Sequence, residues 1–327
     1  LLESGKAGGQ IEAGEQAAGV PVGNGSLGEI GVDRGGPDTD QHGEVVDVEA
    51  LAAATLDRFG RVDVVVNNAG VIAWNPVTNA VRSGQLDAGA GFEQWLLKFD
   101  GVSGNRDKEL EDPKGYGAIE YAYSLMARAA GITMTATRLL EEGGRRHFMT
   151  RRFDRPGDAD KLHMQSLGAL AHYDYNDPLA HSYEQAFLAI RKLGLGMDAV
   201  EEQYRRMAFN VIARNQDDHV KNIAFLMDRR GRWSLSPAFD ITYAYNPTGR
   251  QTAQHQMSLN GKRDGFTRVD FDAVAATALM SGTRARAIVD EVRGAVVEWP
   301  AHAGGAGVPE RDMERIAAVH LLEIPAA

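Results

Sequence analysis

Two short stretches decide how this chain is interpreted: Asn215-Gln216-Asp217-Asp218-His219-Val220-Lys221-Asn222 and Ser236-Pro237-Ala238-Phe239-Asp240. The first contains an Asp followed five positions later by an Asn, and the second adds another Asp beyond a predicted hairpin. Phosphoryl transfer needs a carboxylate that orients and deprotonates the attacking hydroxyl, together with oxygen ligands that hold Mg²⁺ against the phosphates. The two stretches together therefore predict a phosphoryl-transfer site.

The segments on either side favour the first stretch as a catalytic loop. Before it, apolar side chains recur at helical spacing over residues 200–214, and after it an apolar run over 223–227 predicts a strand. A loop held between a helix and a strand has a rigid base for its polar side chains. We therefore expect the two Asp residues and the Asn of this loop to be held in fixed positions.

These residues resemble the HipA-like toxin kinases of bacterial toxin–antitoxin pairs. That family's catalytic loop reads Asp-x-His-x-Lys-Asn, and its metal-binding Asp lies in a Pro-Ala-Tyr/Phe-Asp turn. The resemblance implies that Asp217 is the catalytic base and that Asn222 and Asp240 bind Mg²⁺. Asp218 is the adjacent alternative for the base, but the Asp-x-His register gives that role to Asp217.

Two further loop residues, His219 and Lys221, have two interpretations. They could be a metal ligand and a catalytic ammonium, or they could brace the loop and contact a phosphate or the substrate, which is at least as well supported. A lone His beside two Asp residues is not a zinc site. We place both side chains among the nucleotide-binding residues.

Upstream, the sequence predicts the lysine and glutamate of a kinase N-lobe. Lys98 lies on a strand predicted over 95–99, where a kinase places the ammonium that contacts the α- and β-phosphates and pairs with a helix Glu. Glu120 opens a helix predicted over 117–130, which resembles the family's Glu-containing helix before an Ala-Gly-Ile/Leu ending. We expect Lys98 and Glu120 to pair and to belong to the catalytic machinery.

The strand predicted over 148–153 resembles the family's hinge, in which backbone groups meet the adenine. This resemblance implies that Phe153 and Asp154 lie at the nucleotide. A simple turn contact between Asp154 and Arg155 is the alternative.

The order of the predicted elements indicates an α+β, two-lobed, protein-kinase-like fold with a small β-rich N-lobe and a larger helical C-lobe. We divide the chain into a Gly-rich, poorly ordered segment (1–37), an α/β fragment (38–70), the N-lobe (71–153) and the helical C-lobe (154–327). Short strand-like runs are expected at 72–74 and 95–99, and C-lobe helices over 182–193, 200–214, 270–280, 284–297 and 310–321.

Residues 38–70 resemble a different family, the short-chain dehydrogenases/reductases. A predicted helix over 45–59 is followed by a buried parallel strand over 62–66 and by Asn67-Asn68-Ala69-Gly70. The G-x-G-x-x-G match at 23–28 has no strand before it and no helix after it, and no Tyr after Gly70 has the Lys four positions on that proton transfer requires. An NAD(P)-dependent oxidoreductase is therefore an alternative that rests on 38–70 alone.

The turn at 67–70 stands where HipA-like kinases normally carry a Gly-Gly-x-x-x-Lys type loop over the ATP phosphates. Misplacing reacting groups by about 1 Å can lower a rate roughly 100-fold. A second alternative is thus a catalytically impaired, nucleotide-binding pseudokinase that serves as an antitoxin-binding partner.

The composition limits which binding partners and which cellular compartment are expected for this chain. A formal net charge of −10 argues against a surface that binds nucleic acid directly, and the absence of cysteine fits a cytoplasmic protein. No apolar run is long enough to span a membrane, so no membrane partner is expected. The resemblance implies ATP and Mg²⁺ as cofactors and a protein Ser/Thr hydroxyl as acceptor, on a translation factor or an aminoacyl-tRNA synthetase. It also implies a HipB-like helix-turn-helix antitoxin as partner. We expect the chain to contact DNA only through that antitoxin.

Overall fold

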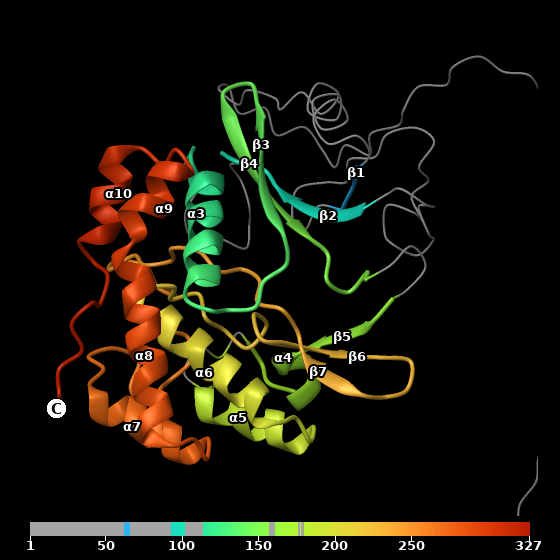
Figure 1. Cartoon of the computed structure of the whole chain (residues 1–327), viewed down its shortest axis with the longest axis vertical. Coiled ribbons are helices and arrows are strands. Elements are labelled where there is room, and N and C mark those ends of the chain that lie inside the picture. The colour runs from blue at the N-terminus through green and yellow to red at the C-terminus, as the bar shows by residue number, and fades with distance from the viewer. Residues whose placement is uncertain (1–61, 66–92, 102–113, 157–160, 176, 178–179) are drawn as a thin grey trace, which may run out of the picture. The chain divides into compact units, whose positions relative to one another are not determined.

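The computed structural model describes residues 62–65, 93–101, 114–156, 161–175, 177 and 180–327 (Figure 1). Several predictions lie outside these residues: the Gly-rich segment 1–37, the helix over 45–59, the Asn-Asn-Ala-Gly turn at 67–70, and the strand-like run at 72–74.

The first sheet contains four strands in the order β1-β2-β4-β3 (Figure 1). β1 (Val62–Val65) is parallel to β2 (Glu93–Lys98), while β4 (Arg145–Arg151) is antiparallel both to β2 and to β3 (Thr137–Glu142). The strands predicted over 62–66 and 95–99 are therefore confirmed as β1 and β2. Because β1 pairs with β2, it shares a sheet with the strand that carries Lys98.

Helix α3 (Tyr116–Ala129) packs against β3 and β4 and confirms the helix predicted over 117–130. Its close approach requires glycine at position 117, because a Cβ atom there would overlap the carbonyl oxygen of Arg146. Gly131 has a φ of +82°, a left-handed conformation that ends helices at little cost for glycine. The buried face of the helix recurs at helical spacing and includes Ile119, Tyr123 and Met126.

A second sheet has the antiparallel order β5-β6-β7, formed by β5 (His163–Ser166), β6 (Ala224–Met227) and β7 (Trp233–Leu235). β6 is the strand predicted over 223–227. The hairpin β6–β7 is the one expected between the two stretches that carry the predicted magnesium ligands.

The rest of the described chain is mainly helical. Its helices are α4 (Leu167–Ala171), α5 (Tyr183–Lys192), α6 (Met197–Ile212), α7 (Arg268–Thr277), α8 (Gly282–Val297), α9 (Trp299–Gly305) and α10 (Glu310–Ala317). All five predicted C-lobe helices are present, with ends that differ by a few residues. Two of the starts are fixed by reciprocal side-chain capping, from Ser182 with Gln185 at α5 and from Thr267 with Asp270 at α7.

Packing among the helices connects the Glu120 helix with the Asn215–Asn222 loop. α6 packs against α5 and α8, and α3 packs against α8 and α9. The hydroxyl of Tyr123 on α3 donates to the carbonyl of Ala213 at 2.7 Å, just after α6 ends. The helix that carries Glu120 is thereby tied to the segment that leads into the Asn215–Asn222 loop. Across the residues that are described, no helix has the length and apolar character needed to cross a membrane.

Candidate active site

Three predicted residues from separate elements meet: Lys98 on β2, Glu120 on α3 and Asp240 after β7. The ammonium of Lys98 lies 2.7 Å from Oε1 of Glu120 and also donates to Oδ1 of Asp240. Burial disfavours the charged ammonium, but the two carboxylates outweigh that effect and raise the pKa of Lys98 above its ordinary value. Lys98 is therefore a fixed cation between a buried carboxylate and a partly exposed one.

The backbone of Asp240 has a φ of 52°, in the left-handed region that residues other than glycine seldom adopt. Such a conformation persists only where the surroundings hold it, and it is common at functional sites. The amide of Ala238 donates to the carbonyl of Thr133 at 2.8 Å, which anchors the turn just before Asp240. The ring of Phe239 lies 5.7 Å from that of Phe153, so the predicted hinge residue stands beside this turn.

The Asn215–Asn222 loop brings Asp217, His219 and Asn222 together. The side-chain amide nitrogen of Asn222 donates to the carbonyl of Asp217 at 2.9 Å, and Nε2 of His219 lies 3.6 Å from Oδ1 of Asp217. The Asp217 carboxylate is half exposed. Since the amide nitrogen of Asn222 makes the internal bond, its amide oxygen can still act as an acceptor or metal ligand.

The two stretches singled out in the sequence run beside each other. Just after the loop ends, the carbonyl of Ala224 accepts a hydrogen bond from the backbone amide of Ser236 at 2.9 Å. Near the start of the loop, the backbone amide of Gln216 donates to the carbonyl of Ala244 at 3.3 Å. The segment that carries Asp240 thus starts beside the end of the loop and finishes beside its beginning.

Lys221 and His219 both contact Tyr175, a residue that the sequence does not single out. The Lys221 ammonium lies 3.3 Å from the centroid of the Tyr175 ring, and the His219 ring meets the same ring edge-on at 6.1 Å. An ammonium over an aromatic face is attracted by the ring quadrupole. The contact gives Lys221 a defined position, while its predicted nucleotide contact stays a prediction.

The predicted hinge strand is too long at its C-terminal end. β4 ends at Arg151, and the last backbone hydrogen bond between β4 and β2 is donated by the amide of Arg152 to the carbonyl of Gln94 at 2.8 Å. Phe153 and Asp154 therefore lie in the turn that follows the strand rather than within it.

The Asp154 carboxylate is held by two guanidinium groups. Arg152 donates to its two oxygens at 2.9 and 2.6 Å, and Arg155 donates to one of them. Burial favours the neutral acid, but these contacts outweigh it and hold the pKa of Asp154 below its ordinary value. The turn contact with Arg155 that was weighed as the alternative is present, and the nucleotide contact stays a prediction.

Asp218, which the sequence offers only as the alternative base, is the more deeply buried of the two aspartates in the loop. It is 3% exposed and accepts hydrogen bonds from the Tyr183 hydroxyl at 2.5 Å, the Gln256 amide at 2.7 Å and Nδ1 of His255 at 2.8 Å. Both of its oxygens are used inside the protein, whereas the neighbouring Asp217 is half exposed. This difference in exposure favours Asp217 over Asp218 as a base that meets an incoming hydroxyl.

The donor set fits Mg²⁺ bound together with phosphates. Asp240 offers a carboxylate and Asn222 an amide oxygen, and Mg²⁺ prefers such oxygen ligands, with waters and substrate phosphates completing its shell. Within the ranges that the structure covers, no group of three or more His, Cys, Asp or Glu side chains is placed to hold a metal ion by protein ligands alone.

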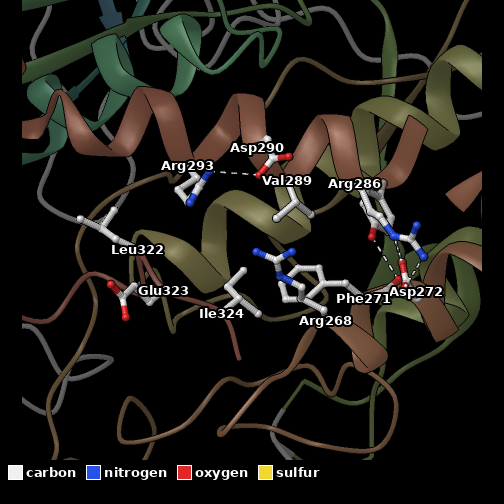
Figure 2. A pocket seen from close by; sticks show the side chains of 11 residues that line it. Arg268, Phe271, Asp272, Arg286, Val289, Asp290, Arg293, Leu322, Glu323 and Ile324 are labelled. Atoms are coloured by element: carbon white, nitrogen blue, oxygen red, sulfur yellow. Dashed lines mark hydrogen bonds and ion pairs between the residues drawn. The ribbon is translucent and has the colours of Figure 1, made fainter. Parts of the chain in front are cut away.

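A pocket of about 280 Å³ lies away from these residues, between α7, α8 and the C-terminal segment (Figure 2). Apolar side chains such as Phe271, Val289 and Ile324 line it, and Arg286 and Asp272 form an ion pair of 3.0 Å at one side. None of the predicted site residues lines this pocket. The pocket is therefore separate from Lys98, Asp240 and the Asn215–Asn222 loop.

Comparison with known proteins identifies the family. Residues 65–299 match the family described as the HipA-like C-terminal domain. A solved structure of the Shewanella oneidensis MR-1 toxin–antitoxin system HipA, HipB and its operator DNA complex is similar, with 16% identity and a TM-score of 0.52 over 64% of this chain and 54% of that chain. The Helicobacter pylori proinflammatory kinase CtkA gives 13% identity and a TM-score of 0.45 over 69% of this chain and 84% of that one. No curated protein matches the sequence.

The likeness to the Shewanella structure is one of fold, and this chain spans about half of that chain, 54% of its length. It confirms the predicted α+β class, with strands that precede a larger helical part. The dehydrogenase-like fragment over 38–70 has no such support, and apart from β1 it lies outside the described residues. Because the family match covers most of the sequence, the chain belongs to the HipA-like C-terminal domain family.

Proposed function

We propose that this chain is an ATP- and Mg²⁺-dependent kinase of the HipA type that transfers the γ-phosphate to a Ser or Thr hydroxyl of a protein. The observation that carries the proposal is the contact of Lys98 with both Glu120 and Asp240. The three residues are far apart in the sequence and lie on β2, on α3 and after β7. A lysine that pairs with a helix glutamate next to a metal-binding aspartate is the arrangement on which protein kinases depend.

Each of these residues has a role in the proposed reaction. Lys98 binds the α- and β-phosphates, and the buried Glu120 keeps its ammonium in place. Asp240 and Asn222 hold Mg²⁺, which neutralises charge on the phosphates when it is bound. Asp217, half exposed at the tip of its loop, orients the acceptor hydroxyl and takes up its proton.

The remaining predicted residues surround the nucleotide. Phe153 lies beside Phe239, the neighbour of Asp240, and this ring contact supports its place at the adenine side. Asp154 follows directly, and its position is fixed by Arg152 and Arg155. His219 and Lys221 lie in the loop that carries Asp217, where an imidazole and an ammonium suit contacts with phosphate oxygens.

The proposed biological role is that of the toxin in a type II toxin–antitoxin pair in the cytoplasm. A HipB-like helix-turn-helix antitoxin is the proposed partner, and the similar Shewanella structure, whose title names HipA, HipB and operator DNA, supports it. The net charge of −10 favours contact with DNA through the antitoxin rather than directly. The proposed acceptor is a translation factor or an aminoacyl-tRNA synthetase.

The test is transfer of labelled γ-phosphate from Mg-ATP, measured by autophosphorylation and on bacterial lysate. Asp217→Ala should lower transfer by about 10² to 10⁴ and leave ATP binding intact, because the base acts on the acceptor and not on the nucleotide. The matched control is Asp312→Ala, which removes a surface carboxylate that pairs with Arg315 on α10 and should leave transfer unchanged.

Two results would replace this proposal. ATP binding by the parent without any transfer would support the pseudokinase alternative, in keeping with the missing Gly-rich phosphate loop at 67–70. Binding of NADPH without binding of ATP would support the oxidoreductase alternative.

A further inference from the structure

The carboxylate next to the proposed base lies in a buried hydrogen-bond network that the proposed chemistry does not use. The side chain of Asp218 is fully buried. Its Oδ1 accepts from the Gln256 amide, and its Oδ2 accepts from the Tyr183 hydroxyl and from Nδ1 of His255. The carboxylate is therefore held from two segments, the start of α5 and the chain around residues 255–256.

The same network reaches the beginning of the loop. Asn210, in the last turn of α6, donates from its side-chain nitrogen to the Tyr183 hydroxyl at 3.0 Å. Its side-chain oxygen accepts a hydrogen bond from the side-chain nitrogen of Asn215 at 3.0 Å, and its backbone carbonyl accepts one from the Asn215 backbone amide at 2.9 Å. Tyr183 thus bonds Asp218 directly and is linked through Asn210 to Asn215, three residues earlier.

The two segments that hold Asp218 are themselves bonded to each other. The amide of Tyr183 donates to the carbonyl of Ser258 at 2.9 Å, and the amide of Ser258 donates to the carbonyl of His181 at 2.9 Å. The capping box of Ser182 and Gln185 fixes the same end of α5. The network is therefore anchored at the start of α5 and in the segment over 255–258 that is bonded to it.

We propose that Asp218 is a positioning residue that, with Tyr183 and His255, fixes the backbone from which Asp217 presents its carboxylate to the acceptor. The Asp218 side chain is fully buried and the adjacent Asp217 side chain is half exposed, so an anchor at Asp218 restricts the backbone that carries Asp217. This role rests on the proposed function, because it is defined by the task of Asp217. Errors of about 1 Å in a reacting group lower rates by roughly 100-fold, so an anchored neighbour has a direct effect on the rate.

Tyr183→Phe tests the role with the least disturbance, because it removes one hydroxyl and keeps the buried ring. Replacing Asp218 itself would leave the donors around it without an acceptor, and that variant could simply unfold. The matched control is Tyr204→Phe: Tyr204 is equally buried, and its hydroxyl donates to the carbonyl of Phe271 at 3.0 Å, far along the chain from the loop.

Two measurements separate positioning from a general loss of stability. Hydrogen–deuterium exchange followed by mass spectrometry should show peptides over 215–222 exchanging about tenfold faster in Tyr183→Phe and unchanged in Tyr204→Phe. The kcat for phosphate transfer should fall about tenfold in Tyr183→Phe with the Kd for ATP unchanged. In an Asp217→Ala background the same change should cause no further loss, because the two residues act as one unit.

The exchange result does not depend on activity. Unchanged exchange over 215–222 in Tyr183→Phe, or an equal rise in Tyr204→Phe, would overturn the positioning role. A full kcat in Tyr183→Phe, measured on an active parent, would overturn it as well. If the parent transfers no phosphate at all, the proposed function fails, while faster exchange confined to Tyr183→Phe would still show that this network holds the loop.

Discussion

Replacing Lys98 by methionine tests whether the ion pair that joins β2 to α3 holds the site together. Methionine has a similar length and keeps the packing of the aliphatic stem, so the change removes mainly the charge. The Glu120 side chain is 7% exposed and would lose the ammonium that lies 2.7 Å from it. The predicted effect is a loss of stability as well as of phosphate transfer.

The size of the effect follows from how the pair is exposed. Breaking a fully buried ion pair costs about 3 to 5 kcal/mol, whereas an exposed pair contributes about 0 to 1 kcal/mol. Here one partner is buried and the Lys98 side chain is 35% exposed, so we expect Lys98→Met to lower the free energy of unfolding by about 2 kcal/mol. Adding Glu120→Gln should restore about 1 kcal/mol, because a neutral amide is less costly to bury without a cation.

The assay is urea unfolding followed by tryptophan fluorescence for the parent, both single variants and the double variant. A change of midpoint at constant slope reports stability alone. Lys192→Met, at the exposed end of α5, is the control and should change stability by less than about 0.5 kcal/mol.

Two results would refute this reasoning. One is a Lys98→Met variant that loses no more stability than Lys192→Met. The other is an effect of Glu120→Gln that is equal in the presence and absence of Lys98, since additivity would mean that the two side chains do not interact in solution.

Three further predictions concern other parts of the molecule. Gly117→Ala should destabilise the protein by about 2 kcal/mol in urea unfolding, because its Cβ overlaps the Arg146 carbonyl and pushes α3 from the sheet; unchanged stability would contradict the packing. Hydrogen bonds outweigh burial and lower the pKa of Asp270 to about 2, so its contribution is present above pH 4 and is lost as the pH falls towards 2. Asp270→Asn should accordingly cost about 1 kcal/mol at pH 7 and less at pH 2.5, and a cost that grows on acidification would be inconsistent with this sign. Tyr175→Leu should lower phosphate transfer a few-fold while Tyr175→Phe retains it, because only an aromatic ring attracts the Lys221 ammonium; equal rates in both would exclude that role.

The helices were accessible from sequence because their signals are local. Apolar residues at helical spacing locate α3, α5, α6, α7, α8 and α10, and Gly131 marks the end of α3. The strands β3 and β5 and the short helices α4 and α9 were not predicted. Short elements of this kind owe their stability to the neighbours they pair with or pack against, and a single segment does not carry that information.

The same distinction applies to the site. The identities and spacing of Asp217, Asn222 and Asp240 indicate phosphoryl transfer from the sequence alone, because that reaction requires these functional groups. Their shared location with Lys98 does not follow from spacing: Lys98 and Asp240 are 142 positions apart and meet only because β2 and the segment after β7 converge. The end of the hinge strand was misplaced for a similar reason, since a strand ends where its pairing with a distant segment ends, here at the bond between Arg152 and Gln94.

The sequence by itself therefore determined the order of the main elements, and it predicted the kind of chemistry and the residues that we propose for it. Only the tertiary structure decided which of two adjacent aspartates faces outward and which is buried with Tyr183 and His255. The physical reason is that burial and hydrogen bonding are sums over segments distant in the chain. Two residues of the same type and the same local context can differ in every property that those contacts control.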